Sequence, residues 1–286
     1  MDATRRFSLE HPVVPGDPPE AAACVAAASG LSKGAVKDAM AKGAVWVARA
    51  GGPPRRLRRV KAAVRPGDVV TIHYDAELLA WRPPEPRLLR DATRWSAWWK
   101  PAGLLSQGSP FGDHGSLLRF AEVSLDRAAF LVHRLDRETD GVMLVVHDGK
   151  AAAAFSALFR EGRIEKRYLS EVKGDVAASL GAEGTFDAPL DGKQAVTRYR
   201  VVSYDPDRDA TLLDLTIETG RTHQIRRHLE AAGHPVLGDP RYGAGASDPR
   251  GLRLTAVSLA FRDPFTGEEV SLSQPSTPTR APIEAS

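Results

Sequence analysis

Three segments of the chain place charged residues in otherwise apolar surroundings, and each could carry chemistry. They are residues 99–105 (WKPAGLL), 133–141 (HRLDRETDG) and 220–243 (GRTHQIRRHLEAAGHPVLGDPRYG). In the second segment, Asp136 lies in a predicted loop between two apolar runs, so a rigid scaffold would present its carboxylate. Such a carboxylate is a candidate nucleophile, which a neighbouring guanidinium would keep ionised and aimed. The alternative is a surface aspartate paired with Arg134 or Arg137.

Two further candidates come from the pattern of the later segments. Arg221 precedes Thr222, which is predicted to cap a helix running to residue 232, and anions are favoured at such a helix start. The alternative is an ordinary surface residue near a cap. Tyr168 lies on a predicted strand, where a tyrosine is more commonly part of the core.

The histidines of the third segment raise the question of a metal site. His223 and His228 are five residues apart and His234 follows six later, which puts the first two on different helix faces, unlike zinc-binding helices. The single cysteine, Cys24, excludes cysteine-rich zinc modules and internal disulfides. We therefore predict no metal.

Together, the three segments closely resemble the signature of the RluA family of pseudouridine synthases, and they occur in the family's order. Residues 166–169 (KRYL) look like the family's Lys-x-Tyr strand, and residues 193–199 also fit. The resemblance covers roughly residues 95–272. It implies an isomerase that converts uridine to pseudouridine in RNA without a cofactor.

The resemblance also implies roles for individual residues. Asp136 would be the catalytic carboxylate, Arg221 would pair with it, and Tyr168 would stack on uracil and assist proton transfer. The other implied substrate contacts are Arg134, Ile225, Lys100 and Arg226. The reaction breaks the N1–C1′ bond, rotates the uracil and rejoins it through C5; attack on C1′, addition to the base and removal of the 2′ proton are all open to the carboxylate. A uridine in folded RNA would have to be extruded to reach it.

Two positions depart from the family's pattern. Asp140 stands where serine is common, and Trp99 stands where a small polar residue, often asparagine, is usual. Neither change touches the three implied catalytic residues. We therefore expect the departures to affect the choice of target.

Positive charge is concentrated in one part of the chain. The 286 residues carry a net charge of only +3, but residues 33–65 contain ten basic residues and one acidic residue. This window therefore carries +9, which predicts a polyanion-binding appendage on a more neutral body. The alternative is a solvated basic face. The predicted RNA-binding residues are Lys33, Lys37, Lys42, Arg55, Arg56, Arg58 and Arg59.

The elements around this window resemble an S4-type RNA-binding module. A short helix is predicted to end at Gly30, and Ser32 is predicted to cap a second helix over residues 33–42 with Val36, Ala39 and Met40 on its inner face. Strands are predicted over 44–48 and 69–74, with the basic loop between them.

The chain is predicted to divide into an S4-like α/β module with a proline-rich linker, a catalytic domain and a disordered tail, over residues 1–86, 87–274 and 275–286. The second part reads as an α+β domain with a mixed or antiparallel central sheet and flanking helices, because its strands and helices follow no βαβ rhythm. This is the pseudouridine synthase fold that the resemblance implies.

Composition excludes several classes of protein. No apolar stretch approaches the ~18 residues of a membrane span, and the first residues lack the apolar core of a secretory signal. We therefore expect a cytoplasmic protein that does not bind membranes. The resemblance implies RNA as the partner, ribosomal RNA first and tRNA second, and we expect a monomer. The leading alternative is a non-catalytic RNA-binding protein on the same fold. A weaker one is a glycosidase-like hydrolase that uses Asp136 and Asp140 as its carboxylate pair.

Overall fold

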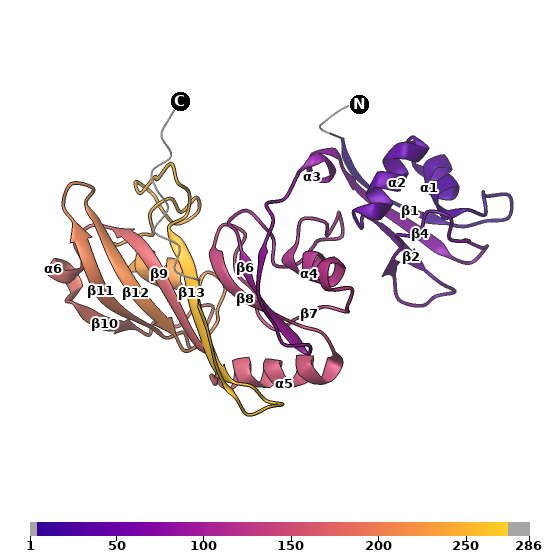
Figure 1. Cartoon of the computed structure of the whole chain (residues 1–286). Coiled ribbons are helices and arrows are strands. Elements are labelled where there is room, and N and C mark those ends of the chain that lie inside the picture. Colours follow the sequence, from indigo (N-terminus) through magenta and orange to yellow (C-terminus); the bar gives the residue numbers. More distant parts are fainter. Residues whose placement is uncertain (1–4, 274–286) are drawn as a thin grey trace. The chain divides into compact units, whose positions relative to one another are not determined.

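The computed structural model describes residues 5–273, which fold into two compact units (Figure 1). Within this range, the first unit holds residues 5–84 and 107–126, and the second holds residues 85–106 and 127–273. Residues 107–126, which the sequence prediction placed in the second domain, therefore belong to the first unit. The predicted tail at 275–286 lies outside the described residues.

A four-stranded antiparallel sheet in the order β1-β4-β2-β3 forms the base of the first unit. Its strands are β1 (Arg6–Pro12), β2 (Val45–Ala48), β3 (Arg55–Arg56) and β4 (Val69–Asp75). Its helices are α1 (Ala21–Ser29), α2 (Lys33–Ala41), α3 (Ala76–Ala80) and α4 (Leu117–Leu125). As predicted, Gly30 ends α1 in the left-handed conformation (φ 69°), and the Ser32 side chain caps α2 by accepting from the Ala35 backbone N–H at 3.2 Å.

The predicted inner face of α2 is confirmed, whereas two other parts of this unit differ from the sequence prediction. Val36, Ala39 and Met40 are fully buried in the core of the unit. Strand β1 was not predicted, because it alternates half-buried and exposed residues and contains no strong apolar run. The proline-rich linker, predicted over residues 79–86, begins inside α3, whose Leu79 is buried in the same core.

Residues 107–126 contact the basic residues around β3, and Trp46 of β2, in the first unit. Asp113 pairs with Arg58 and, at 3.1 Å, with the Nε of Arg56. The Arg56 guanidinium also lies over the ring of Trp46, 4.3 Å from its centroid, and the Trp46 indole N–H donates to the carbonyl of Pro110 at 3.0 Å. Some of the basic residues of the window therefore serve the packing of this unit.

The second unit contains a ten-stranded mixed sheet with the main order β10-β11-β12-β9-β13-β8-β6-β5 (Figure 1). Its strands are β5 (Arg87–Asp91), β6 (Trp95–Lys100), β7 (Phe130–Leu131), β8 (Asp140–Val146), β9 (Glu165–Lys173), β10 (Glu183–Phe186), β11 (Thr197–Asp205), β12 (Ala210–Ile217), β13 (Leu254–Arg262) and β14 (Glu269–Ser273). Its helices are α5 (Gly149–Arg160), α6 (Val176–Leu180) and α7 (Gln224–Ala231). Within the described chain, β8 and β13 pair in parallel and the other neighbours are antiparallel, so the predicted α+β class is confirmed.

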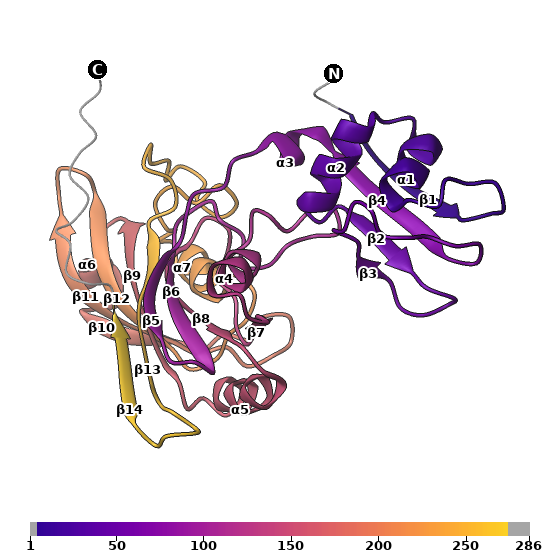
Figure 2. The ribbon, with the colours of Figure 1, turned by 45° about the vertical axis from the view of Figure 1, so that its right-hand side comes forward.

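Helix α5 closes one core of this sheet (Figure 2). The Asp148 side chain caps the helix by accepting from the Ala151 N–H at 2.8 Å. Phe155 then meets Trp95 and Phe261 edge to face, with ring centroids 6.3 and 5.4 Å apart. This packing orders β8 at its Val146 end, which pairs with Trp95, whereas the segment containing Asp136 leads into the other end of the strand at Asp140.

A glycine allows β8 and β13 to approach each other directly after that segment. Gly141 has a φ of 132°, and a Cβ atom added there would lie 2.2 Å from the carbonyl oxygen of Ala256. Only glycine fits both the backbone conformation and the contact. The position of Asp136 therefore depends on a glycine five residues later.

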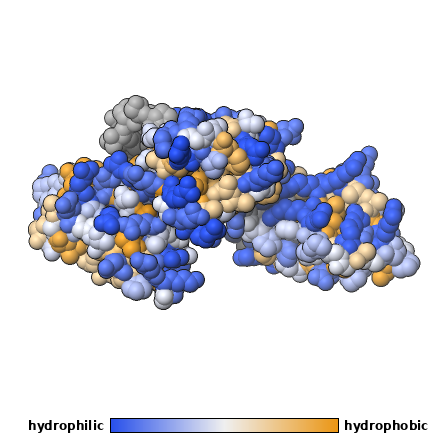
Figure 3. Space-filling model, turned by 90° about the horizontal axis from the view of Figure 1, so that it is seen from below, coloured by the Kyte–Doolittle hydropathy of each residue, from blue (hydrophilic) through white to orange (hydrophobic). Residues whose placement is uncertain are grey.

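Hydrophilic residues cover much of the face seen in Figure 3, and apolar ones interrupt them. The large apolar side chains that are exposed are spread over several elements, among them Val123 in α4, Phe130 in β7 and Val202 in β11. In residues 5–273, no helix combines the length and the apolar character needed to cross a membrane.

Candidate active site

A cavity of about 510 Å³ opens in the second unit and brings together residues distant in the sequence. Most of its wall comes from three parts of the chain, the segment 132–139 before β8, the inner face of β9, and residues 217–226 from the end of β12 into α7. The end of α5 and the start of β13 complete it with Phe159, Arg160 and Leu254. Asp136, Tyr168 and Ile225 all line it, as the sequence predicted for a shared site. Arg134, Arg221 and Arg226 line it as well.

The segment that carries Asp136 has no helix or strand of its own and is held by the first motif. The Ser106 hydroxyl donates to the Leu135 carbonyl at 2.7 Å, and the Leu135 N–H donates back to it at 3.0 Å. The Gly103 N–H donates to the Arg137 carbonyl at 2.7 Å. These bonds fix the backbone on both sides of Asp136, whose side chain remains 19% exposed to the cavity.

Lys100 belongs to this support. The sequence analysis took it as a contact to the RNA substrate, but its burial leaves it no surface for that contact. It is fully buried, and its ammonium donates to the carbonyls of Pro101, Leu104 and Arg137 at 2.8–3.2 Å. Burial lowers the pKa of Lys100 to about 8, and the nearby carboxylates of Asp140 and others oppose that shift. The prediction was wrong because a charged residue in a motif was taken to face solvent, whereas here backbone carbonyls surround it.

Arg226 joins the Asp136 carboxylate to a second, deeper carboxylate. Its Nη1 donates to Asp136 Oδ2 at 2.9 Å, while its Nε and Nη2 donate to the two oxygens of Asp239 at 2.6 and 2.7 Å. Arg226 is 3% exposed and Asp239 is fully buried. Burial lowers the pKa of Arg226, but the hydrogen bonds to both carboxylates outweigh it and raise the pKa above its ordinary range. The guanidinium is thus a fixed cation that orients Asp136.

The predicted pairing of Arg221 with Asp136 is therefore wrong. Arg221 is exposed at the cavity wall, and its Nε donates to the carbonyl of Gln194 at 2.9 Å. Arg226, predicted to contact RNA, is almost fully buried and makes the contact expected of Arg221. The two arginines stand in the same motif, and only the geometry of the chain between them separates their roles.

That geometry begins with the start of α7, which differs from the prediction. The helix starts at Gln224 after His223, whose backbone is left-handed (φ 52°), and Thr222 is exposed and does not cap it. The Gln224 side chain instead accepts from the Thr219 hydroxyl at 2.6 Å and from the Arg221 N–H at 3.0 Å. Its amide group donates to the Val196 carbonyl at 2.9 Å. Gln224 thus anchors the turn and sets the rotation of the helix.

Tyr168 and Ile225 supply the apolar part of the cavity. Tyr168 lies on β9 between Leu215 of β12 and Ala256 of β13, and both Tyr168 and Ile225 are largely buried. Burial raises the pKa of the Tyr168 phenol above its ordinary range, and the Asp136 carboxylate raises it further. Tyr168 is therefore protonated at neutral pH. A carboxylate, a phenol and an apolar wall around a space of this size suit a planar polar ligand.

Three further residues from the sequence analysis, Arg134, Asp140 and Trp99, lie in different surroundings. Arg134 is exposed at the cavity wall. Asp140 begins β8, and its carboxylate accepts from the Thr255 hydroxyl at 2.6 Å. Trp99 lies on β6 opposite Val142 and packs against the core closed by α5. Asp140 does not line the cavity that contains Asp136, so the two do not act as a pair of carboxylates in one cleft.

Comparison with known proteins assigns the family. Residues 94–231 match the RNA pseudouridylate synthase family. An RNA pseudouridine synthase of Bacillus subtilis, YjbO, named as uncharacterized, is 31% identical over 239 residues, which cover 76% of this chain and 83% of that protein. The chain belongs to the RNA pseudouridine synthase family.

Other relatives agree with this family and its fold. Ribosomal large subunit pseudouridine synthase D of Xanthomonas campestris is 34% identical over 209 residues, 62% of this chain and 61% of that protein. The chain spans 50–62% of the length of three of its curated relatives. The solved structure of human RNA pseudouridylate synthase domain containing 1 has a TM-score of 0.57 at 23% identity, over 68% of this chain and 86% of that one. The resemblance to the RluA family is confirmed, and the S4-like module stays a prediction.

The predicted RNA-binding residues of this family member fall into two groups in the first unit. Lys42 pairs with Asp38 at 2.8 Å, and Arg56 and Arg58 bind Asp113, so these three are engaged within the unit. The exposed group, for which no partner is found in the described part of the chain, consists of Lys33, Lys37, Arg55 and Arg59.

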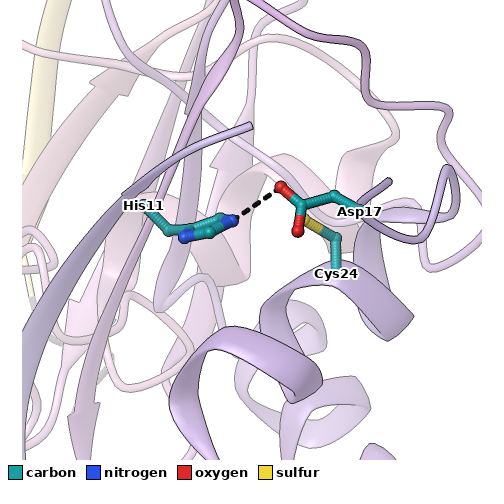
Figure 4. Close-up of side chains that lie close together, drawn as sticks. All are labelled: His11, Asp17 and Cys24. Carbon is teal, nitrogen blue, oxygen red and sulfur yellow. Dashed lines mark hydrogen bonds and ion pairs between the residues drawn. The ribbon is translucent and has the colours of Figure 1, made fainter. Parts of the chain in front are cut away.

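Among the described residues, one trio of potential metal ligands lies together, in the first unit and not in the cavity. It consists of His11, Asp17 and Cys24 (Figure 4). His11 Nε2 and Asp17 bond directly at 2.8 Å, and the same carboxylate oxygen accepts from the Val14 N–H at 2.8 Å. Burial raises the pKa of the Cys24 thiol, which disfavours the thiolate that metals bind. These contacts are those of a hydrogen-bonded turn.

Three residues near Asp136 were missed by the sequence prediction of site residues. They are His223, Asp239 and Tyr242. His223 was considered only as a metal ligand, and Asp239 and Tyr242 were read only as part of the family motif. A signal existed in the sequence, because Asp239 and Tyr242 follow the predicted helix and so cannot serve as residues of its inner face.

Proposed function

We propose that this protein isomerises uridine to pseudouridine in RNA, with Asp136 as the catalytic carboxylate. The observation that carries the proposal is the cavity in which Arg226 orients Asp136 beside the buried Tyr168 and Ile225. Ribosomal RNA of the large subunit is the proposed substrate and tRNA the second choice, because the Xanthomonas relative is named for the former. We place the reaction in the cytoplasm and expect a monomer.

The residues of the cavity divide the work of this reaction. The target uridine leaves its stack and enters the cavity, where Tyr168 and Ile225 contact the uracil ring. Asp136 acts on the nucleoside while Arg226 fixes the direction of its carboxylate. The N1–C1′ bond breaks, the uracil rotates within the cavity, and C5 forms the new bond to C1′; C5 then loses its proton and N1 gains one. Tyr168, protonated at neutral pH, assists the accompanying proton transfer.

The exposed cations supply RNA affinity in this proposal. Arg134 at the cavity wall contacts the RNA around the extruded uridine. In the proposed S4-like module, which covers residues 1–86, the exposed cations Lys33, Lys37, Arg55 and Arg59 bind a second stretch of backbone. Lys42, Arg56 and Arg58 are assigned to the packing of the unit, since each has a partner there.

Replacement of Asp136 tests the proposal most directly. The variant Asp136→Asn keeps the size of the side chain and removes the carboxylate, so we expect pseudouridine formation to fall at least ~1,000-fold. Its affinity for RNA should stay within about threefold, since Asp136 adds no cation. Pseudouridine mapping of total RNA from cells with and without the gene identifies the target and supplies the substrate for the assay.

The outcomes separate the proposal from its main alternative. Retained modification by Asp136→Asn would refute the role of Asp136. RNA that binds the wild-type protein but contains no uridine modified by it would favour a non-catalytic RNA-binding protein. Asp140→Asn is the matched control, because that carboxylate bonds to Thr255 outside the cavity and should leave the reaction rate within about threefold.

A further inference from the structure

Two side chains approach the Asp136 carboxylate, one at each oxygen. Arg226 donates to Oδ2 at 2.9 Å, and Nε2 of His223 lies 3.6 Å from Oδ1. The other ring nitrogen of His223, Nδ1, lies 3.0 Å from the Tyr242 hydroxyl. His223 thus stands between the carboxylate and a tyrosine, and the proposed mechanism has not used it.

The two neighbours of the imidazole favour one of its tautomers. If the Tyr242 hydroxyl donates to Nδ1, the proton of the neutral ring is on Nε2 and faces the carboxylate. The opposite tautomer would turn the Nε2 lone pair toward a negative charge. Electrostatics therefore favours an Nε2–H aimed at Asp136 Oδ1.

The backbone of His223 is strained in a way that places the ring there. Its φ of 52° is in the left-handed region, which costs a non-glycine residue on the order of 1 kcal/mol or more and persists where surrounding contacts enforce it. The residue makes no side-chain cap for α7. Its ring instead lies edge-on to Tyr242, with centroids 5.6 Å apart and planes at 72°. The left-handed backbone at the start of α7 thus also sets the position of the ring beside Tyr242.

One turn orients both donors to the catalytic carboxylate. Asp239 holds Arg226 with two hydrogen bonds, and the same carboxylate accepts from the N–H groups of Arg241 and Tyr242 at 2.8 and 2.9 Å. Tyr242, at the end of that turn, holds His223. The turn from Asp239 to Tyr242 is therefore a common support for the two groups that face Asp136.

We propose that His223 is a positioning residue for Asp136, held by Tyr242, and that protonation of its ring suppresses activity on the acid side. The inference rests on the proposed function. It deepens that function by naming a regulator of the catalytic carboxylate.

The charges around the ring give the direction of the pH effect. Burial lowers the pKa of His223 below its ordinary value, and the groups that face it partly cancel. The carboxylates Asp136 and Asp239 raise this pKa, and the guanidinium groups of Arg226 and Arg241 lower it; Tyr242 faces the ring from the turn. His223 is therefore neutral at pH 7. Below its pKa, the imidazolium forms an ion pair with Asp136 that weakens the carboxylate as a nucleophile or base.

Single-turnover kinetics with saturating RNA test the effect on activity. His223→Ala should lower the rate at about pH 7.5 by tenfold or more while the Kd for RNA stays within about threefold. His223→Gln offers a side-chain amide donor without a titrating group. It should stay within about threefold of wild type at that pH and lose the fall in rate that wild type shows at acidic pH. His73→Gln, in the first unit, is the control and should keep the wild-type profile.

A titration of the free protein tests the same inference without any substrate. The His223 imidazole is followed by NMR in wild type, Asp136→Asn and Tyr242→Phe. Because the Asp136 carboxylate raises the pKa of His223, Asp136→Asn should lower that pKa further. Tyr242→Phe should change the ring's tautomer signals.

The outcomes distinguish this inference from the proposed function. An unchanged His223 titration in Asp136→Asn overturns the inference, whatever the protein's reaction is. A His223→Gln enzyme whose rate falls at acidic pH as in wild type also overturns the inference. A protein in which His223 titrates as expected but no RNA is modified retains the contact and refutes the proposed function instead.

Discussion

Basic residues around the cavity of the second unit and on the surface of the first unit differ in what surrounds them. In the second unit, Lys100 and Arg226 are at most 3% exposed, and backbone carbonyls or carboxylates take up their hydrogen bonds. In the first unit, Lys33, Lys37 and Arg55 are exposed along α2 and β3. The buried cations organise the site, and the exposed ones remain available to a polyanion.

The difference shows why charge in a sequence does not identify its purpose. The basic window of residues 33–65 itself contains both kinds, since Arg56 and Arg58 bind Asp113 while Arg59 is exposed. A buried ion pair is costly to break, whereas an exposed cation contributes little to folding. The comparison can therefore be tested by measuring stability and RNA binding for each kind.

The largest effect is expected from removing the buried guanidinium. Arg226→Met leaves the fully buried Asp239 carboxylate without its cation, so the free energy of unfolding should fall by about 3–5 kcal/mol. Activity should also be lost, because Asp136 loses the donor at Oδ2. Urea denaturation followed by circular dichroism measures the stability.

Arg227→Met is the matched control for this experiment. Arg227 is the next residue on α7, but it pairs with Asp191, whose side chain is 70% exposed. The loss of stability should stay below about 1 kcal/mol. Equal losses in the two variants would contradict the distinction between buried and exposed cations.

A smaller effect is expected from the titration of Lys100. Its pKa of about 8 in the folded state lies below the unfolded value of 10.5, so between these values the unfolded chain binds more protons. The stability of wild type should therefore rise with pH in this range, by at most about 3 kcal/mol relative to Lys100→Met. Denaturation midpoints of both proteins at pH 7.5, 9 and 10 measure it. A constant difference between them would show that Lys100 does not titrate there.

The smallest effect on stability is expected from the exposed cations. Replacing Lys33, Lys37, Arg55 and Arg59 by glutamine should change the free energy of unfolding by no more than about 0.5 kcal/mol per position. The RNA affinity should fall. The slope of the logarithm of the binding constant against the logarithm of the salt concentration should become less negative, by up to ~0.7–0.9 for each phosphate that the protein no longer neutralises. Filter binding at several salt concentrations measures the slope. An unchanged slope would remove these residues from the RNA interface.

Much of the site could be read from the sequence because the motifs supply residue types at fixed spacing. The α+β class and the shared cavity of Asp136, Tyr168 and Ile225 followed from that reading. The choice between Arg221 and Arg226 did not. It depends on where α7 starts, which the left-handed backbone of His223 and the contacts of the Gln224 side chain with Val196 and Thr197 determine.

The environment of a charged side chain was equally hard to predict. Lys100 looked like a surface contact because the sequence does not show that three carbonyls from two loops converge on it. The place of residues 107–126 in the first unit also depends on a contact far along the chain, that of Asp113 with Arg56 and Arg58. Such long-range pairings have no local pattern.

The position of residues 107–126 has a consequence for dissecting the protein into parts. The chain passes between the two units three times, after residues 84, 106 and 126. A truncation that begins at Arg87 would keep Asp113 while removing both of its arginine partners, and Trp46 would no longer hold Pro110. To isolate the second unit, one would have to remove residues 107–126 as well and join residue 106 to residue 127 through a new connection.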